Sequence, residues 1–183
     1  AGKSVDVSSV ASFFVSRVDT KVDNRLEKII EAGGPEAEKA KSLLGKTAIA
    51  NAKLAYANYK EVFSSERFLK LKAKGAKVQK PLWASTSTKN PDYSDVRYVE
   101  ELIGKNTVNT MPQRTLDAFL DHGNVDLTLE QDLRDAKQTF EDLKMLGISM
   151  DKVTDELVEE GVKSFSDSFE VLLDAIEEEL KKA

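Results

Sequence analysis

Residues 7–15 read VSSVASFFV, and this stretch decides the fold class of the chain. It is rich in β-branched and aromatic residues and contains neither glycine nor proline, so we expect a β-strand. Because its apolar residues are nearly continuous, they predict a strand of a parallel sheet that is covered on both faces.

Helical patterns follow this strand. Asp19 or Thr20 is a suitable N-cap for the first helix, and Gly33 is a suitable end for it. The segment 47–63, TAIANAKLAYANYKEVF, is rich in Ala and repeats its large apolar residues at spacings of three and four, as a helix packed against a sheet requires. The helices expected in this part of the chain are 21–30, 36–44, 46–63 and 67–74.

Two further strands are expected, at 81–86 (PLWAST) and 107–110 (TVNT). Strands that alternate with helices are typical of parallel βα units. A closed (β/α)8 barrel needs eight strands and about 250 residues, and a three-stranded parallel sheet leaves two bare edges, so these strands are expected to be part of a larger sheet. The remaining helices are expected at 94–103, 113–121, 129–146 and from 151 to the C-terminus, where Gly161 is a candidate break.

Composition excludes several functional classes. The 183 residues carry a net charge of −5 with 40% hydrophobic residues, so the chain can bury a core but is not a polybasic nucleic-acid binder. The chain has no Cys and one His, which excludes disulfides, thiolate and multi-histidine metal sites and cysteine nucleophiles. No apolar run is long enough to span a membrane, and no signal segment is present. The C-terminal third, 124–183, is an acidic helical tail with 7 basic and 17 acidic residues.

Candidate functional residues follow the three strands, because functional groups collect at the carboxyl ends of parallel strands. Arg17 and Lys89 follow neighbouring strands with hydroxyl groups beside them, and a guanidinium and an ammonium complement phosphate oxygens. In the alternative, Arg17 pairs with an acid such as Asp19 and the Ser/Thr residues only form turns. The residues at the three strand ends are Ser12, Phe14, Ser16 and Arg17; Ser85, Ser87, Thr88 and Lys89; and Asn109 and Thr110.

Other polar and aromatic residues favour structural roles. His122 precedes Gly123 at a helix end, where a histidine more often complements the helix dipole than catalyses. Runs of adjacent glutamates such as 177–179 fall in helical patterns and are expected to be solvated. Trp83 and the pair Tyr56 and Tyr59 are expected in the core.

Several strings in this order resemble the C-terminal half of the transaldolase family. This resemblance implies an α/β fold, namely part of a (β/α)8 TIM barrel in which the three strands are strands six to eight, with additional C-terminal helices. Residues 1–183 are then the C-terminal portion of a single barrel domain. The strings are VASFFVSRVDTKVD (10–23), GKTAIANAKLAYANYKEVF (45–63), PLWASTSTKNPDYSDVRYVEELIG (81–104), TVNTMPQRTLDAFLDHG (107–123) and the tail GISMDKVTDELVEEGVKSFSDSFEVLLDAIEEEL (147–180).

The resemblance also implies an activity. Transaldolases move a dihydroxyacetone unit between sugar phosphates of the pentose phosphate pathway through a lysine Schiff base. The implied substrates are fructose 6-phosphate, sedoheptulose 7-phosphate, erythrose 4-phosphate and glyceraldehyde 3-phosphate, with no cofactor and no metal. By resemblance, Ser12 and Phe14 line the substrate site, Arg17 and Ser85 contact the phosphate, and Lys89 is the nearest counterpart of a family arginine that follows that serine.

The family's Schiff-base lysine lies on its fourth strand, and its acid and amide residues lie on its first, third and fifth strands. None of these segments is in this chain, and no lysine lies within the three expected strands, so no amine is placed to act as the nucleophile. The chain alone is therefore expected to be inactive, and an N-terminal transaldolase chain is the expected partner that completes the barrel. The family implies the cytoplasm, or alternatively a plastid. A different reading is a non-catalytic fragment that binds sugar phosphates or serves as an interaction module.

Overall fold

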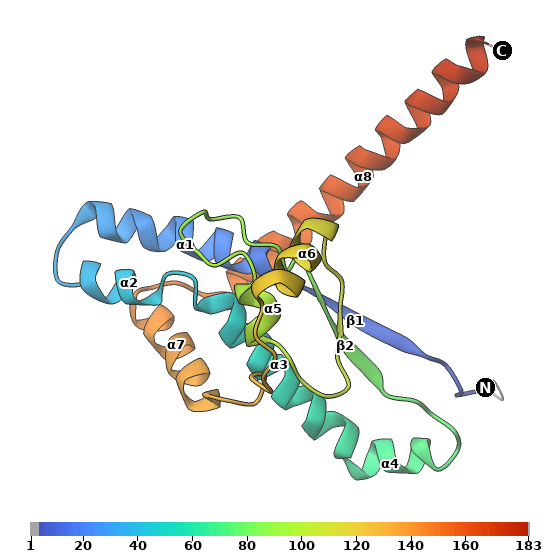
Figure 1. Cartoon of the computed structure of the whole chain (residues 1–183), viewed down its shortest axis with the longest axis horizontal. Helices are drawn as coiled ribbons and strands as arrows, with labels where there is room; N and C mark the ends of the chain where they lie inside the picture. Colours follow the sequence, from blue (N-terminus) through green and yellow to red (C-terminus); the bar gives the residue numbers. More distant parts are fainter. Residues whose placement is uncertain (1–3, 183) are drawn as a thin grey trace. The chain divides into compact units, whose positions relative to one another are not determined.

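The computed structural model describes residues 4–182, which fold into two units, 4–148 and 149–182. The first unit holds a small parallel sheet and seven helices, counted over its described residues (Figure 1). The second is a single helix. The elements are β1 (Ser9–Phe14), α1 (Val15–Ala32), α2 (Ala37–Leu43), α3 (Thr47–Ser64), α4 (Glu66–Lys72), β2 (Gln79–Ala84), α5 (Arg97–Glu101), β3 (Val108–Asn109), α6 (Gln113–His122), α7 (Leu133–Met145) and α8 (Met150–Lys182).

The sheet has the order β1-β2-β3 with both pairs parallel, which confirms the expected βα alternation. In the register, Phe13 lies beside Trp83 and Trp83 beside Asn109. The Phe13 and Trp83 rings contact each other at 5.5 Å between centroids, and Trp83 is fully buried as expected. The three strands therefore end together, which brings their following loops to one edge of the sheet.

The expectation that β1 is covered on both faces is wrong. Val10 and Phe14 are 45% and 38% exposed, and Ser12 between them is also exposed. Within the described residues β1 pairs only with β2, so it is an edge strand that lacks the neighbours its apolar residues would need for burial.

The first helix begins earlier than expected. α1 starts at Val15, directly after β1, so neither Asp19 nor Thr20 is its N-cap. Both lie inside the helix, where Thr20 Oγ1 donates to the Ser16 carbonyl and the Asp19 carboxylate bonds outside α1. The end is as expected, because Gly33 has φ +70°, a backbone conformation that glycine adopts at little cost.

The second strand also begins earlier than expected, so Lys80 lies inside β2 and the expectation that no lysine lies in a strand is wrong. Lys80 is exposed and is the second residue of the strand, at the amino end rather than the carboxyl end of the sheet. It is therefore not placed as a buried amine at the strand ends, where such a nucleophile would be needed.

The core of the first unit forms where α1 and α3 pack together. Val22 and Leu26 of α1 are fully buried, and so are Ala48 and Ala52 of α3 to within 1%. Small alanines let the two helices approach closely. The Ala-rich segment forms α3, as the sequence predicted.

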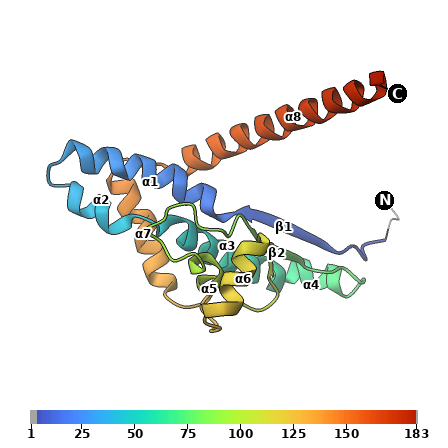
Figure 2. The ribbon, with the colours of Figure 1, turned by 45° about the horizontal axis from the view of Figure 1, so that its top comes forward.

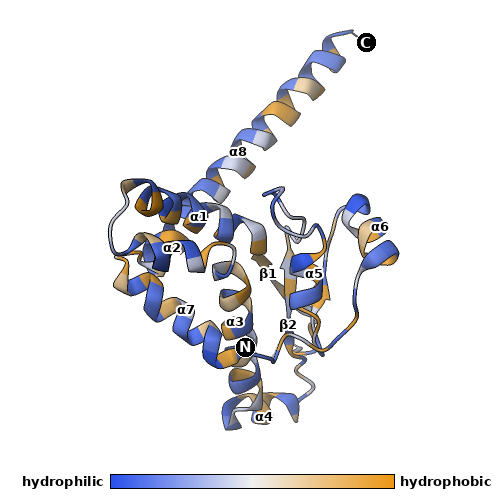
Figure 3. Cartoon of the chain, turned by 60° about the vertical axis from the view of Figure 1, so that its left-hand side comes forward, coloured by the Kyte–Doolittle hydropathy of each residue, from blue (hydrophilic) through white to orange (hydrophobic). Residues whose placement is uncertain are grey.

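The second unit, α8, is continuous through Gly161, so the candidate break there is not present. A glycine inside a helix costs only about 1 kcal/mol relative to alanine, and ion pairs such as Lys163–Asp167 support the helix beyond it. Figures 2 and 3 show α8 as one unbroken ribbon, and Figure 3 shows both polar and apolar residues along it. Its last described residue is Lys182, and Ala183 lies outside the described part.

Candidate functional site

Hydrogen bonds join the carboxyl ends of the three strands. The Ser16 N–H, which follows β1, donates to the Ser85 carbonyl after β2 at 3.1 Å. The buried Thr86 hydroxyl donates to Asn109 Oδ1 of β3 at 2.9 Å. The segments that carry the predicted site residues after β1 and β2 are therefore fixed side by side.

Arg17 is exposed at the start of α1, and its guanidinium lies over the Phe14 ring at 4.8 Å from the centroid. The alternative in which Arg17 pairs with Asp19 is wrong. The Asp19 carboxylate instead accepts the Ala48 N–H at 2.7 Å and the Tyr98 hydroxyl at 2.7 Å. Arg17 forms no ion pair within residues 4–182, so its guanidinium is available to an anion.

Ser85 has φ +53°, which is uncommon for a residue with a side chain. The position follows β2 directly, and in this conformation its carbonyl meets the Ser16 N–H. Ser12 lies on the exposed edge strand, two residues before Phe14, so the two side chains share one face of β1.

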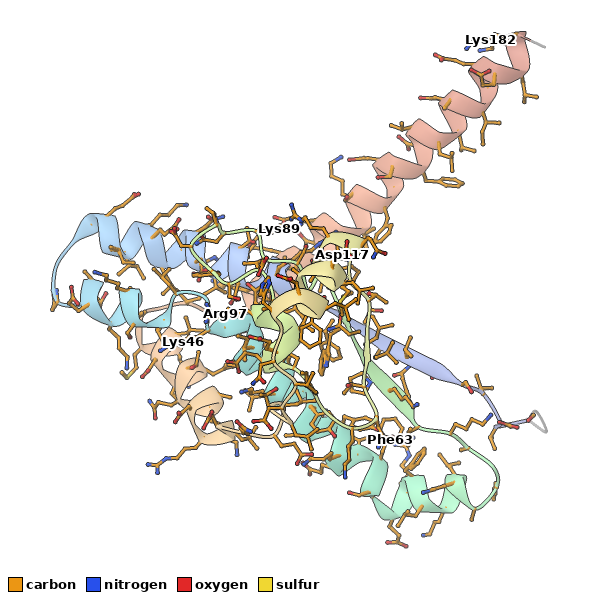
Figure 4. All side chains as sticks on the ribbon, in the orientation of Figure 1. Lys46, Phe63, Lys89, Arg97, Asp117 and Lys182 are labelled. Atoms are coloured by element: carbon orange, nitrogen blue, oxygen red, sulfur yellow. The ribbon has the colours of Figure 1, made fainter. Side chains whose placement is uncertain are left out.

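Lys89 lies further along the loop 85–96, which connects β2 to α5 (Figure 4). The loop passes between α1 and α6, and Lys89 lines a cavity on each side of it. Neither cavity is lined by Ser12, Phe14, Arg17 or Ser85. The backbone at the end of β1 therefore lies beside that of Ser85. Lys89 lies in a different part of the loop 85–96.

Two buried aspartates of α1 hold the segments around this loop, and the sequence reasoning assigned neither to that role. Asp23 accepts the Gly45 N–H at 3.0 Å and the Tyr93 hydroxyl at 2.9 Å, and Tyr93 belongs to the loop. Asp19 caps the N-terminus of α3 through Ala48 and holds α5 through Tyr98.

Burial raises the pKa of Asp19 to about 6, because desolvation outweighs the hydrogen bonds from Ala48 and Tyr98 that favour the charged form. Burial likewise raises the pKa of Asp23. A signal for both was present in the sequence, because they fall four residues apart on the same helical face as Val15, Val22 and Leu26.

His122 lies in the last turn of α6, as expected for a residue that complements a helix end. Its Nε2 lies 2.9 Å from Asp95 Oδ1 and its Nδ1 lies 3.1 Å from Asp121 Oδ2. These hydrogen bonds raise the pKa of His122 and lower that of Asp95. Because Asp95 is in the loop 85–96, this pair joins the loop to α6.

Within residues 4–182 no cluster of three or more His, Cys, Asp or Glu side chains has the arrangement of a metal site. No helix in that range is both long enough and apolar enough to cross a bilayer. Lys53 of α3 is buried, but its Nζ is paired with Glu101 Oε2 of α5 at 3.2 Å.

Comparisons with known proteins match nearly the whole chain. A family model described as Transaldolase/Fructose-6-phosphate aldolase matches residues 1–176. A transaldolase of Mycolicibacterium smegmatis is 52% identical over 178 residues, which cover 97% of this chain and 46% of that protein. A transaldolase of Frankia alni is 52% identical, covering 100% of this chain and 48% of that protein, and one of Trichodesmium erythraeum is 47% identical, covering 99% and 49%. The chain therefore spans about half the length of the curated relatives it matches.

Proposed function

Since the chain belongs to the transaldolase/fructose-6-phosphate aldolase family, we propose that it is the C-terminal part of a transaldolase. The observation that carries this proposal is the identity of about half the residues across nearly the entire chain, combined with coverage of about half of each relative. The remaining half of the enzyme would be supplied by a segment or chain outside these residues.

In the whole protein, β1, β2 and β3 would be strands six, seven and eight of a (β/α)8 barrel. The parallel order β1-β2-β3 supports this assignment, because consecutive barrel strands pair in chain order. The exposed β1 supports it as well, since a preceding strand beside β1 and the opposite wall of a barrel would cover Val10 and Phe14.

The proposed reaction is transfer of a dihydroxyacetone unit from fructose 6-phosphate or sedoheptulose 7-phosphate to erythrose 4-phosphate or glyceraldehyde 3-phosphate in the pentose phosphate pathway. A lysine amine in the absent part would attack the ketose carbonyl and release water as the imine forms. The bacterial relatives favour the cytoplasm as the compartment of this reaction.

The described residues would bind the substrate rather than react with it. The exposed guanidinium of Arg17, together with Ser85 and Lys89, would hold the phosphate, while Ser12 and Phe14 would line the sugar site. Binding at the phosphate is remote from the carbonyl, so its binding energy would position that carbonyl for the amine.

The chain can be tested for the nucleophile by incubation with fructose 6-phosphate and borohydride, followed by intact mass measurement under denaturing conditions. We expect no adduct on the 20.3 kDa chain alone. When the N-terminal half of the M. smegmatis transaldolase is added, that second chain should gain the reduced adduct. An adduct on this chain would contradict the proposed location of the nucleophile.

The binding role can be tested by fusing the N-terminal half of the same relative to this chain and measuring transfer from fructose 6-phosphate to erythrose 4-phosphate. Arg17→Gln should lower kcat/KM by roughly tenfold or more, the scale of a lost charge-assisted hydrogen bond. Arg67→Gln, which removes the same charge from exposed α4, is the matched control and should leave the rate unchanged. A folded fusion that binds sugar phosphates but transfers nothing would instead support the non-catalytic reading.

A further inference from the structure

Helix α8 carries a long stripe of exposed apolar side chains. The stripe residues recur at spacings of four and three, so they fall on one face of the helix. Each of them is between 48% and 67% exposed, and Figure 3 shows apolar residues along the length of α8. An exposed apolar face of this length marks an interaction surface. The stripe consists of Val158, Val162, Phe165, Phe169, Leu172 and Ile176.

The spacing of the stripe matches positions a and d of a heptad repeat. From Val158 to Ile176 the steps are four, three, four, three and four residues. This is the pattern of a helix that packs against a second helix in a coiled coil, where each a or d side chain inserts between side chains of the partner. The spacing therefore indicates that another helix with the same repeat is a suitable partner.

The charges of α8 are placed so that two copies of the helix can pair. Although the helix is acidic, its charged residues between 161 and 176 all lie on the face opposite the stripe, at Lys163, Asp167, Glu170 and Asp174. The positions directly beside the stripe are uncharged in the same range, and they are Gly161, Ser166, Ser168, Leu173 and Ala175. Acidic residues lie beside the stripe toward its two ends, as at Glu159 and Glu179. Repulsion between two copies is therefore confined to the ends.

The apolar area of the stripe is large enough for a stable pair. A large apolar side chain that is half to two-thirds exposed presents roughly 100 Å² to solvent. Pairing of two such helices would therefore bury roughly 1,200 Å² of stripe surface, which reaches the range of about 1,200 to 2,000 Å² that specific protein interfaces bury.

We propose that α8 is an interaction surface for a second copy of this chain, and that two copies pair through their stripes as a two-stranded coiled coil. The heptad spacing and the uncharged flanks favour this partner, because the α8 of another copy supplies both. Such an interface uses the same surface on both copies, so it closes into a dimer and leaves no stripe free for a third copy. The inference goes beyond the proposed function, since it needs neither the absent half of the enzyme nor a substrate.

The test is sedimentation equilibrium of the 183-residue chain over a range of concentrations. We expect an equilibrium between monomer and dimer. Val162→Lys should raise the dissociation constant by roughly tenfold or more, because each copy loses a buried apolar side chain and gains a charge within the interface. Ile176→Lys, at another stripe position, should act in the same way. Added salt should tighten the dimer, since it screens the acidic ends of the stripe.

Val171→Lys is the matched control. Val171 is the same residue type as Val162 on the same helix, and both are 67% exposed, but Val171 lies outside the stripe. Val10→Lys is a second control, because it changes the exposed edge strand β1 and leaves α8 intact. Both variants should dimerise as the wild type does. Circular dichroism of each variant checks that it keeps its helix content.

Several results would overturn the inference. A folded chain that stays monomeric at every concentration would show that α8 binds no second copy and that its stripe is covered in another way. Equal weakening by V162K and V171K would show that the stripe has no special role. A dimer that V10K abolishes and V162K does not would place the interface at β1, and a dimer that salt dissociates would be held by charge rather than by the stripe.

Discussion

Asp19 is an acid placed where the fold excludes water. The residue is 2% exposed, and its carboxylate accepts hydrogen bonds from both α3 and α5, through the Ala48 N–H and the Tyr98 hydroxyl. The hydrogen bonds favour the charged form, yet desolvation is the larger effect and the pKa rises to about 6. Asp19 therefore joins the helices, but at neutral pH its ionised form makes the folded state less stable than its protonated form would.

The raised pKa gives a prediction for stability against pH. The folded chain binds the Asp19 proton more tightly than the unfolded chain, so this contribution to stability is complete below the unfolded value of 3.8 and is lost as the pH rises through about 6. Asp19→Asn keeps a carbonyl oxygen for Ala48 but cannot ionise. Between about pH 4 and pH 7, the free energy of unfolding of the wild type relative to D19N should fall by about 2 to 3 kcal/mol.

Urea unfolding of both proteins at the two pH values measures this difference, and the comparison cancels the titration of all other groups that behave alike in both. A difference that stays flat or rises with pH would contradict the assignment of a raised pKa to Asp19.

Tyr93 gives a second prediction at the scale of one residue. Its hydroxyl donates to Asp23 Oδ2 at 2.9 Å and so ties the loop 85–96 to α1. Tyr93→Phe should lower the free energy of unfolding by about 1 kcal/mol and speed amide hydrogen exchange in 88–95. Tyr59→Phe is the control, because Tyr59 interacts through its ring with Tyr56 and Phe63. Equal effects of the two variants would show that the Asp23 bond does not hold the loop.

At the scale of helices and strands, the spacing of apolar residues and the glycines that end helices predicted most of the elements. They did not predict how far these elements are buried. The helix over 47–63 and the stop at Gly33 are as expected, since apolar spacing and glycine conformation act locally. The coverage of β1 was wrong because burial of a strand depends on neighbours far away in the sequence. The start of α1 was wrong because Asp19 has the chemistry of a cap but is used by a different helix.

Of the candidate site, too, the sequence predicted one part and missed another. The sequence predicted which residues follow the strands, and the backbone bond between Ser16 and Ser85 confirms that the ends of β1 and β2 meet. It did not predict that Lys89 would line cavities apart from Arg17, or that Arg114 of α6 would face the same space, because loop paths depend on tertiary contacts such as Tyr93 to Asp23. The roles of Ser12, Phe14, Arg17, Ser85 and Lys89 in binding stay predictions.

Two glycines provide a test at the level of helices. A Cβ added at Gly161, inside α8, meets nothing within 4 Å, so Gly161→Ala should stabilise that helix by about 0.5 to 1 kcal/mol. Gly33 also has open space but its φ is +70°, so Gly33→Ala should destabilise the first unit by about 1 kcal/mol. Hydrogen exchange of α8 and of α1 amides measures the two effects, and stabilisation by both changes would contradict the helix end at Gly33.

At the scale of the whole molecule, the first unit has a core but an incomplete sheet. The helices bury Leu26 and Trp83 completely, whereas the outer strand β1 remains half exposed. If the chain is half of a barrel, then adding the N-terminal half of a relative should slow hydrogen exchange of those β1 amides that do not bond to β2. The amides of α7, on another element, are the internal control and should change little. Equal protection throughout the chain would indicate general stabilisation rather than pairing at β1.

The free edge of β1 has a further consequence for handling the protein. The backbone N–H and C=O groups on the outer side of β1 can pair with any extended chain, and the exposed Val10 and Phe14 would be buried by that pairing. Fibrous aggregation of the isolated chain would therefore start at β1 and grow with concentration. Charged residues or a proline introduced at the exposed positions of β1 would act as gatekeepers against it, and the same changes would also obstruct any natural strand that pairs there.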